Sequence, residues 1–430
     1  MRKIRTIGIC AAVLLVAFSF SSAMAAQVSL RFSDWHLTED VWNKSLNEAM
    51  DIFHKRYPNI KVTLEPVSYK EKETKYTVES AAGMAPDVFH VHAFSLPMFF
   101  SKGFAKDLTP FIKKEGPGFM DAWYPLPIKL MKHKGKIHAM PGDYMTMVLF
   151  YNTEMFKAAG IPTNRPPKTW HEFLEYAKRL TRDTDGDGKI DQWGFGTLGS
   201  KSPGFTLRFG PFIWSFGADY LTPDMKRSAL DSPEAKEAFA FFVELYTKHK
   251  VVPPGMTAMG AQDVRTQFAQ KKVAMILGSG WTPPIVNKIN PDLKAFEVLQ
   301  CAPAPVKRRG ATAIWLSSWV MSPNTKHPKE AWELLKFITS KKIELKWFVD
   351  NRVTSSRKDV SGVAPEILND KFASVMASQL PYGKVEPQIK QWPEIIDTFT
   401  TSLQEAIVGM KTPQKALAEA HKRINAILAR

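Results

Sequence analysis

The segment from residue 183 to residue 194 carries oxygen ligands at the spacing of a calcium-binding loop. The predicted ligands are the carboxylates of Asp183, Asp185, Asp187 and Asp191 and the main-chain carbonyl of Lys189. A hard cation takes six to eight oxygens, and a tight loop with Gly188 at its sixth position turns alternate side chains inward. The twelfth position is Gly194, where such loops carry a bidentate glutamate. We therefore expect a structural Ca2+ ion that is bound weakly, and the alternative is an aspartate-rich turn that binds nothing.

Tryptophan is the second residue type whose placement suggests chemistry, and the chain has 12 of them. Five lie next to Gly, Ser or Pro, at predicted strand ends or loops: Trp35, Trp214, Trp281, Trp315 and Trp319. An indole face stacks on the apolar face of a sugar ring, and a few placed polar groups then orient the sugar. These five predict a carbohydrate pocket, unless each fills the core of its own domain. Five others lie in helical patterns and are predicted to be core: Trp42, Trp170, Trp332, Trp347 and Trp392.

Sequence signals for catalysis or for a cofactor are weak. The glycines at 194, 196 and 199 match a dinucleotide fingerprint in letters, but no strand-to-helix turn accompanies them. His90 and His92 would share one face of a strand without a third ligand, so we interpret them as a structural pair. The sequence has no Walker loop, Gly-x-Ser-x-Gly elbow, His-Glu-x-x-His or Cys-x-x-Cys motif. These common motifs therefore give no support to a catalytic or cofactor-binding function.

Strands and helices alternate along the chain, which predicts an α/β architecture. Alternating or apolar runs predict strands at 28–32, 60–64, 88–91, 272–277 and 314–321, and helical spacing predicts helices at 170–180, 233–249 and 393–430, the last broken at Gly409. This order favours mainly parallel sheets covered by helices, with ligands beyond the carboxyl ends of the strands. Three extended segments, at 136–151, 302–305 and 351–356, are predicted to cross between two lobes.

The first 25 residues have the features of a cleavable signal peptide. Basic residues precede an apolar run at 7–20 that is short for a membrane span, and Ala23-Met24-Ala25 follows as a cleavage pattern. Cys10 lacks a lipobox, and its removal would leave Cys301 as the only cysteine, so no internal disulfide is expected. The net charge is +16 with scattered Lys and Arg. Such scatter predicts a solvated surface and no nucleic-acid partner, and acidic ligands stay open.

Five segments in order resemble extracellular solute-binding protein family 1, the group that includes maltose-binding protein. They are Ala-Ala-Gly-Met-Ala-Pro-Asp-Val at 81–88, Leu-Phe-Tyr-Asn-Thr-Glu-Met-Phe-Lys-Ala-Ala-Gly-Ile-Pro at 149–162, Pro-Lys-Thr-Trp-His-Glu-Phe at 167–173, Val-Ala-Met-Ile-Leu-Gly-Ser-Gly at 273–280 and Gly-Met-Lys-Thr-Pro-Gln-Lys-Ala-Leu at 409–417. The resemblance covers essentially the whole chain after the signal peptide.

The resemblance implies a hinged, two-lobed periplasmic binding protein fold of type II. The N-terminal lobe would comprise 26–141 and 302–351, and the C-terminal lobe 142–301 and 352–430. The expected ligand contacts are Trp35, Asp87, Asp143, Tyr144, Trp214, Trp281, Trp315, Ser317, Trp319 and Arg352. Arg357 is an alternative to Arg352, because the proline that many relatives carry before this arginine is missing.

The resemblance also implies a function. The protein would be a monomeric, extracytoplasmic component of an ABC importer that captures a sugar or oligosaccharide and delivers it to a membrane permease. No cofactor is expected beyond the structural Ca2+. The alternatives are a non-sugar ligand such as an organophosphate or polyamine, an adaptor for a chemoreceptor, and an exported glycoside hydrolase, which would need two carboxylates at fixed separation.

Overall fold

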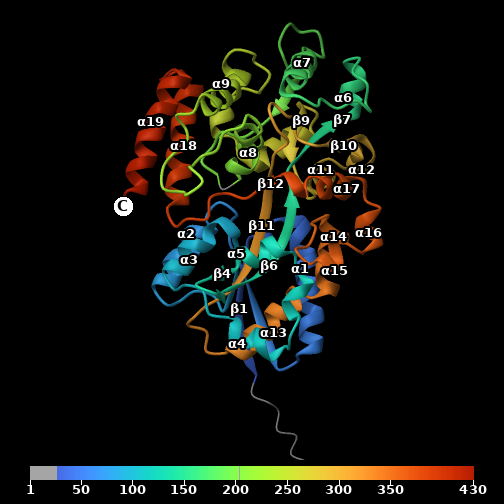
Figure 1. Cartoon of the computed structure of the whole chain (residues 1–430). Coiled ribbons are helices and arrows are strands. Elements are labelled where there is room, and N and C mark those ends of the chain that lie inside the picture. The colour runs from blue at the N-terminus through green and yellow to red at the C-terminus, as the bar shows by residue number, and fades with distance from the viewer. Residues whose placement is uncertain (1–26, 203) are drawn as a thin grey trace, which may run out of the picture.

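The computed structural model describes residues 27–202 and 204–430, so the predicted signal peptide lies outside the described residues. Two α/β lobes lie one above the other in Figure 1. We call the lobe that begins with β1 the lower lobe and the lobe that contains β9 the upper lobe. No helix in the described part of the chain is long and apolar enough to cross a membrane.

The lower lobe is built on a mixed sheet with the strand order β12-β11-β3-β1-β2, and β6 pairs with β11 on its other side. Its strands are β1 (Val28–Asp34), β2 (Ile60–Pro66), β3 (Val88–His92), β6 (Ala139–Thr146), β11 (Thr312–Met321) and β12 (Gly383–Lys384). Strand β1 is parallel to β2 and β3, as expected, whereas β11 is antiparallel to β3 and β6. Strands β4 (Lys132–His133) and β5 (Lys136–Ile137) form a separate hairpin.

The upper lobe is built on a sheet with the order β10-β7-β9-β8. Its strands are β7 (Val148–Asn152), β8 (Trp193–Gly196), β9 (Val273–Gly278) and β10 (Leu299–Ala302). Only β8 and β9 are parallel, because β7 enters from the other lobe and runs antiparallel to β9 and β10. The expectation of a mainly parallel sheet is therefore corrected for this lobe. Strands β7 and β9 are buried throughout, which explains their continuous apolar sequences.

Helices cover both sheets (Figure 1). Around the lower sheet they are α1 (Asp40–Arg56), α2 (Lys72–Ala81), α3 (Leu96–Ser101), α4 (Thr109–Lys114), α5 (Pro125–Leu130), α13 (Pro328–Ile338), α14 (Lys341–Asn351) and α15 (Lys358–Ser361). Around the upper sheet they are α6 (Thr153–Ala158), α7 (Trp170–Leu180), α8 (Phe205–Ser215), α9 (Pro233–Thr247), α10 (Ala261–Ala269), α11 (Thr282–Ile289), α12 (Ala295–Val298), α16 (Pro365–Leu368), α17 (Lys371–Ser378), α18 (Trp392–Ile407) and α19 (Pro413–Leu428).

Local signals set several of these helices. The hydroxyl of Thr169 accepts from the Glu172 amide at the start of α7, and Pro233 follows the N-cap Ser232 of α9. The predicted C-terminal helix is two helices, α18 and α19, and Gly409 between them has a φ of 77°. The five tryptophans that were predicted to be core are all buried, which confirms that interpretation.

Three chain segments pass between the lobes. Only Met147 separates β6 from β7. Strand β11 begins beside Gly383, near the upper lobe, and ends beside Val88 in the lower sheet. The third segment follows α14, and Ser355 forms a β-bridge with Asp143 of β6. The first and third segments coincide with the predicted crossings at 136–151 and 351–356, whereas the second crossing is β11 and not the predicted segment 302–305. The strand pairing at these crossings does not define the residue at which one lobe ends and the other begins. The predicted lobe boundaries therefore stay predictions.

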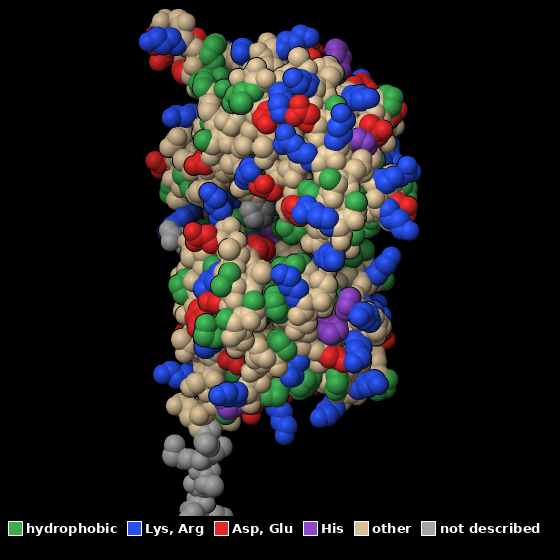
Figure 2. Space-filling view, turned by 90° about the vertical axis from the view of Figure 1, so that its left-hand side faces the viewer, with side chains coloured by type: hydrophobic (Ala, Val, Ile, Leu, Met, Phe, Trp, Pro, Cys, Tyr) green, Lys and Arg blue, Asp and Glu red, His purple; other side chains and the backbone are tan. Residues whose placement is uncertain are grey.

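Charged side chains are spread over the surface rather than gathered. On the face that Figure 2 shows, Lys and Arg alternate with Asp and Glu over both halves of the molecule, and a hollow lies between the halves. This distribution agrees with a solvated basic surface.

Candidate functional site

A small pocket between the lobes collects most of the aromatic residues that the sequence singles out. Its volume is about 40 Å³. It is lined by Trp35, His36, Glu39, Trp42 and Tyr69 from the lower lobe, by Arg208, Ala261, Arg265 and Trp281 from the upper lobe, and by Asp143 and Trp315 from the crossing strands. We call this the inner pocket.

The lower wall follows from the way β1 ends. Asp34, the last residue of β1, accepts from the His36 amide at 2.9 Å and so caps a short 3-10 turn, Trp35–Thr38. That turn places Trp35 beyond the carboxyl end of the strand, where ligands of open α/β sheets bind. The ring of Trp35 stacks on His90, with 3.9 Å between centroids. The stack fixes the plane of the indole.

Asp34 is the centre of a buried network with two imidazoles. Its Oδ1 lies 3.2 Å from Nδ1 of both His36 and His90. Burial raises the pKa of Asp34, but the two imidazoles outweigh burial and hold it well below its usual value. Burial lowers the pKa of both histidines, and Asp34 reverses this only for His36. These three side chains are close enough to hold a metal, although their mutual hydrogen bonds already account for the geometry.

The upper wall depends on a glycine. Trp281 follows β9 after Ser279-Gly280, and a Cβ added at Gly280 would lie 1.9 Å from the carbonyl oxygen of Arg352. Only glycine therefore allows this approach between β9 and the third crossing. The Trp281 ring meets Trp315 edge to face, with 4.8 Å between centroids, and its Nε1 has no hydrogen-bond partner.

The crossing strands supply the carboxylate of the pocket. Trp315 donates from Nε1 to Oδ2 of Asp143 at 3.1 Å, and the Asp143 amide donates to the Ser317 hydroxyl at 3.0 Å. Strands β6 and β11 thus hold Asp143, Trp315 and Ser317 together. Of the predicted ligand contacts, the structure brings Trp35, Asp143, Trp281 and Trp315 together around the inner pocket, and Ser317 lies directly behind Asp143.

The other predicted contacts lie elsewhere. Asp87 stands before β3, at the amino end of the strand, where it accepts from the Arg31 amide and the Thr325 hydroxyl. Trp214 is buried within α8 and donates to Asp219 at 2.9 Å. The expectation that these two face the ligand is corrected, because one is at the wrong end of its strand and the other is in a helix.

Tyr144 and the two candidate arginines are also outside the inner pocket. Tyr144 packs on Tyr124 beside a separate cavity of about 30 Å³. Arg352 has a φ of 58° at the end of α14 and pairs with Asp370 at 3.2 Å. Arg357 pairs with Asp359 and lies over the ring of Trp123. Neither arginine of the third crossing therefore contacts the pocket, which corrects both alternatives.

Trp319 occupies an intermediate position. It stacks on His90 at 3.6 Å and on Phe32 at 5.4 Å, and it lines a very small cavity with Asp34 and Asp143. It therefore supports the wall of the inner pocket from behind.

Among the residues of the inner pocket that were not singled out from the sequence are His36, Tyr69, Arg208 and Arg265. The signal for Arg208 was present, since it is the only charged residue in the apolar segment 205–214. A buried arginine needs a partner or a function. Nothing in the local pattern marks the other three.

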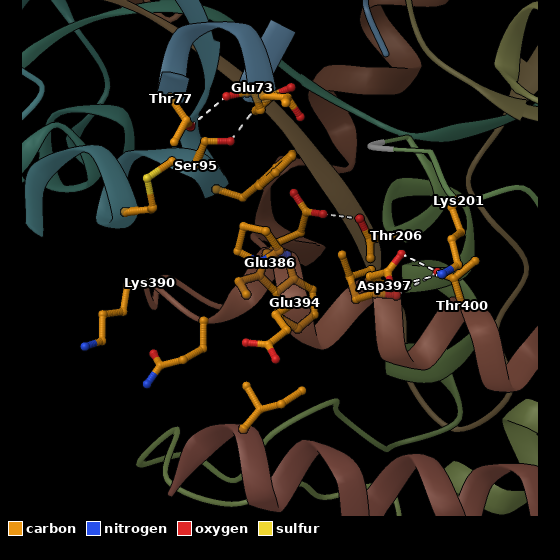
Figure 3. Close-up of a pocket in the computed structure, with 18 of the residues that line it drawn as sticks. Glu73, Thr77, Ser95, Lys201, Thr206, Glu386, Lys390, Glu394, Asp397 and Thr400 are labelled. Atoms are coloured by element: carbon orange, nitrogen blue, oxygen red, sulfur yellow. Dashed lines mark hydrogen bonds and ion pairs between the residues drawn. The ribbon is translucent and has the colours of Figure 1, made fainter. Parts of the chain in front are cut away.

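A second, larger hollow lies at the outer edge of the same interface. It measures about 760 Å³ and separates α2 and α3 from α18 and the C-terminus. Figure 3 shows Glu73, Thr77 and Ser95 on one side and Thr206, Glu386 and Asp397 on the other. Glu386 accepts from the Thr206 hydroxyl, and burial raises its pKa to about 7. This outer groove lacks the convergent indole rings of the inner pocket, so we take the inner pocket as the candidate site.

Residues 36–344 match the family model of the bacterial extracellular solute-binding proteins. The chain belongs to this family. A binding protein of Brucella abortus is 25% identical over 421 residues, which cover 98% of each chain. The sn-glycerol-3-phosphate-binding periplasmic protein UgpB of Yersinia pseudotuberculosis is 23% identical over 453 residues, covering 100% of this chain and 98% of UgpB.

A solved structure gives the same picture of this solute-binding protein. The ABC transporter solute-binding protein of Thermotoga lettingae, bound with alpha-D-tagatose, is 26% identical with a TM-score of 0.85. The match covers 94% of this chain and 100% of that chain. These findings confirm the two-lobed fold and a role with ABC permeases. They also contradict the hypothesis of a glycoside hydrolase, because the family consists of substrate-binding proteins and not of enzymes.

The predicted calcium loop lies on the surface of the upper lobe of this solute-binding protein, between α7 and β8. The carboxylates of Asp183, Asp185 and Asp187 offer oxygens within 4.8 Å of one another. Asp183 accepts from the amides of Gly186 and Gly188, whereas Asp191 accepts from Thr184. The three gathered carboxylates fit a hard cation, and Asp191 would have to leave Thr184 to join them.

We predict that millimolar Ca2+ will raise the melting temperature by a few degrees, because an ion that binds only the folded protein stabilises it. Differential scanning calorimetry with Ca2+ and with chelator measures this shift. Asp185→Asn should abolish it, and Asp231→Asn, at an exposed aspartate of the same lobe, should not. Equal melting temperatures of the wild type in Ca2+ and in chelator would leave the loop as a turn.

Proposed function

We propose that this solute-binding protein captures a sugar or short oligosaccharide between its lobes and delivers it to an ABC permease. The observation that carries the proposal is the convergence of Trp35, Trp281 and Trp315, from three separate segments, on one pocket with Asp143. Indole faces stack on pyranose rings, and a carboxylate accepts from hydroxyls. The Thermotoga relative, bound with alpha-D-tagatose, supports a sugar as the ligand.

Lobe closure is the proposed mechanism of capture. A cavity of about 40 Å³ is far below the roughly 300–1,000 Å³ of typical ligand sites. Because the pocket must be wider with ligand bound than it is in this structure, the ligand enters while the lobes are apart. It favours closure because only the closed form brings walls from both lobes against it. The closed form is then the species that docks on the permease.

The composition of the pocket also bears on the alternatives. A polyamine would meet the guanidinium groups of Arg208 and Arg265, so the pocket disfavours a polycationic ligand. An organophosphate is the second candidate, because the same two arginines suit a phosphate and because UgpB is a glycerol-3-phosphate-binding protein. A role as a chemoreceptor adaptor would use the same ligand and would be detected by co-purification with a receptor.

We also propose that the first 25 residues direct export and are removed, and that the mature protein acts as a monomer in the periplasm. Mass spectrometry of the protein recovered from the periplasm tests the cleavage site near Ala26. Light scattering tests the oligomeric state.

Trp281→Ala should weaken sugar binding by about 10- to 100-fold, because it removes a stacking face from the inner pocket. Isothermal titration calorimetry with the tightest sugar from a thermal-shift panel measures the loss. The matched control is Trp193→Ala, which removes a half-buried indole at the start of β8, outside the pocket. Equal affinity of the Trp281→Ala variant and the wild type would remove the inner pocket as the sugar site.

A further inference from the structure

Arg208 is a buried cation without a counter-charge. It lies in the first turns of α8 and is 6% exposed. Its hydrogen bond runs from Nη1 to the carbonyl oxygen of Gly204 at 3.0 Å. A Cβ at Gly204 would lie 2.7 Å from the same nitrogen, so glycine at this position leaves room for the guanidinium. Arg208 also lines the inner pocket.

Arg265 is a second cation on the same wall. It projects from α10, where its Nη2 donates to Gln262 at 2.9 Å. Its Nε is buried and has no hydrogen-bond partner. Two helices of the upper lobe thus present guanidinium groups to one small pocket.

The electrostatics of the pair favour an anion. Burial, together with the charge of Arg265, lowers the pKa of Arg208 to about 10 against the opposing influence of Tyr69, and burial also lowers the pKa of Arg265. Among the side chains that the structure describes, no carboxylate forms an ion pair with either guanidinium. An unpaired charge held away from water is costly, and two like charges that line one small pocket cost more. A bound oxyanion would remove both penalties at once.

The two carboxylates of the inner pocket do not fill this role. Asp143 is held by the indole of Trp315, on the crossing strands. Glu39 raises the pKa of Arg265 through space but makes no ion pair with it. The pocket therefore has an acidic side, suited to hydroxyl groups, and a basic side. Tyr69 stands beside the basic side as a hydroxyl donor, since burial raises its pKa far above neutrality.

We propose that the ligand is an anionic sugar or polyol, whose carboxylate or phosphate binds Arg208 and Arg265. The inference rests on the proposed function, because the body of the ligand stacks on the indoles of the same pocket. Guanidinium groups bind both oxyanions through paired, charge-assisted hydrogen bonds. A neutral sugar would leave both cations unpaired inside the closed protein.

The test compares matched ligands on the mature protein. Glucose, glucuronate, glucose 6-phosphate, glycerol 3-phosphate and inorganic phosphate are titrated by calorimetry and by thermal shift. We expect an anionic probe to bind at least about 10-fold more tightly than glucose. Glucuronate and glucose 6-phosphate distinguish a carboxylate from a phosphate. Glycerol 3-phosphate and inorganic phosphate show whether the sugar ring is needed.

Two variants assign the anion to the arginines. Arg265→Gln and Arg208→Gln should each weaken the anionic probe by about 10- to 100-fold and weaken glucose by a much smaller factor. Arg265 is only partly buried, so its variant serves if Arg208→Gln does not fold. Arg165→Gln, at an exposed arginine of the same lobe, controls for net charge and should bind like the wild type.

Each outcome separates the two proposals. If neutral sugars bind as well as their anionic counterparts, and both arginine variants keep full affinity, the anionic ligand is refuted and sugar capture stands. If inorganic phosphate binds, no sugar binds, and Arg265→Gln abolishes phosphate binding, the arginines form an anion site and the proposal of sugar capture is refuted. Failure of every probe to shift the melting temperature would overturn both.

Discussion

Trp319→Ala will lower the free energy of unfolding by about 3–5 kcal/mol, the usual cost of removing a buried tryptophan. The side chain is 3% exposed and fills the space between His90 and Phe32. It also supports the stack that fixes Trp35, since His90 lies against both indoles. Urea denaturation followed by circular dichroism measures the loss. Ligand affinity should fall less than in Trp281→Ala, because Trp319 does not line the inner pocket.

Trp319→Phe is the matched control for this prediction. The Nε1 of Trp319 is buried without a hydrogen-bond partner, so phenylalanine forfeits no hydrogen bond and keeps the stack on His90. This variant should retain most of the stability. A Trp319→Ala protein as stable as the wild type, with ligand binding abolished, would instead make Trp319 a direct ligand contact.

Glu344→Gln will stabilise the protein at alkaline pH by on the order of a few kcal/mol. Glu344 lies in α14 with 2% exposure, and burial, assisted by the charge of Asp143, raises its pKa from 4.5 to about 8. Between these values the folded protein holds a proton that the unfolded chain has released. Stability therefore falls as pH rises from 4.5 to about 8 and is constant above that. Glutamine is neutral at every pH and removes this loss.

Urea unfolding at pH 5 and pH 9 measures the effect. The wild type should lose stability between these values, and Glu344→Gln should lose less. Burial also raises the pKa of Glu386 to about 7, so Glu386 lowers the stability over the same pH range. The Glu344→Gln variant should therefore still lose some stability as the pH rises. Glu366→Gln, at an exposed glutamate, should follow the wild type. If Glu344→Gln lost as much stability between pH 5 and pH 9 as the wild type, Glu344 would be ionised in the folded protein.

The predicted site residues that the structure brings together are those whose place the topology fixes. Trp35 follows a parallel strand, Trp281 follows β9, and Asp143, Trp315 and Ser317 lie on strands that cross between the lobes. Strand direction and chain order are readable from periodicity, so the meeting of these side chains is readable too. The α/β class and the crossing segments were predicted from the same patterns, and the family resemblance added the hinged, two-lobed fold.

The errors arise where local sequence and tertiary context disagree. Trp214 was assigned to a strand end or loop because of its Gly, Ser or Pro neighbours, yet it lies inside α8 together with Gly210 and Pro211. A Cβ at Gly210 would lie 2.4 Å from the Trp214 ring, so this glycine makes room for the indole instead of breaking the helix. Arg265 was missed because its role depends on how the upper lobe faces the lower, which no pattern within α10 encodes.

The hydrogen-bonded crossings limit how this molecule can move. Strands β6 and β11 pair along most of their length, and Ser355 of the third segment forms a β-bridge with Asp143 of β6. A ribbon of paired strands twists easily but resists stretching and sliding, because sliding breaks its whole ladder of hydrogen bonds. The lobes can therefore open mainly by a change in the angle between them, and the paired strands resist other relative motions of the lobes. A membrane partner that distinguishes loaded from empty protein then has a single mechanical variable to read, whatever the chemistry of the cargo.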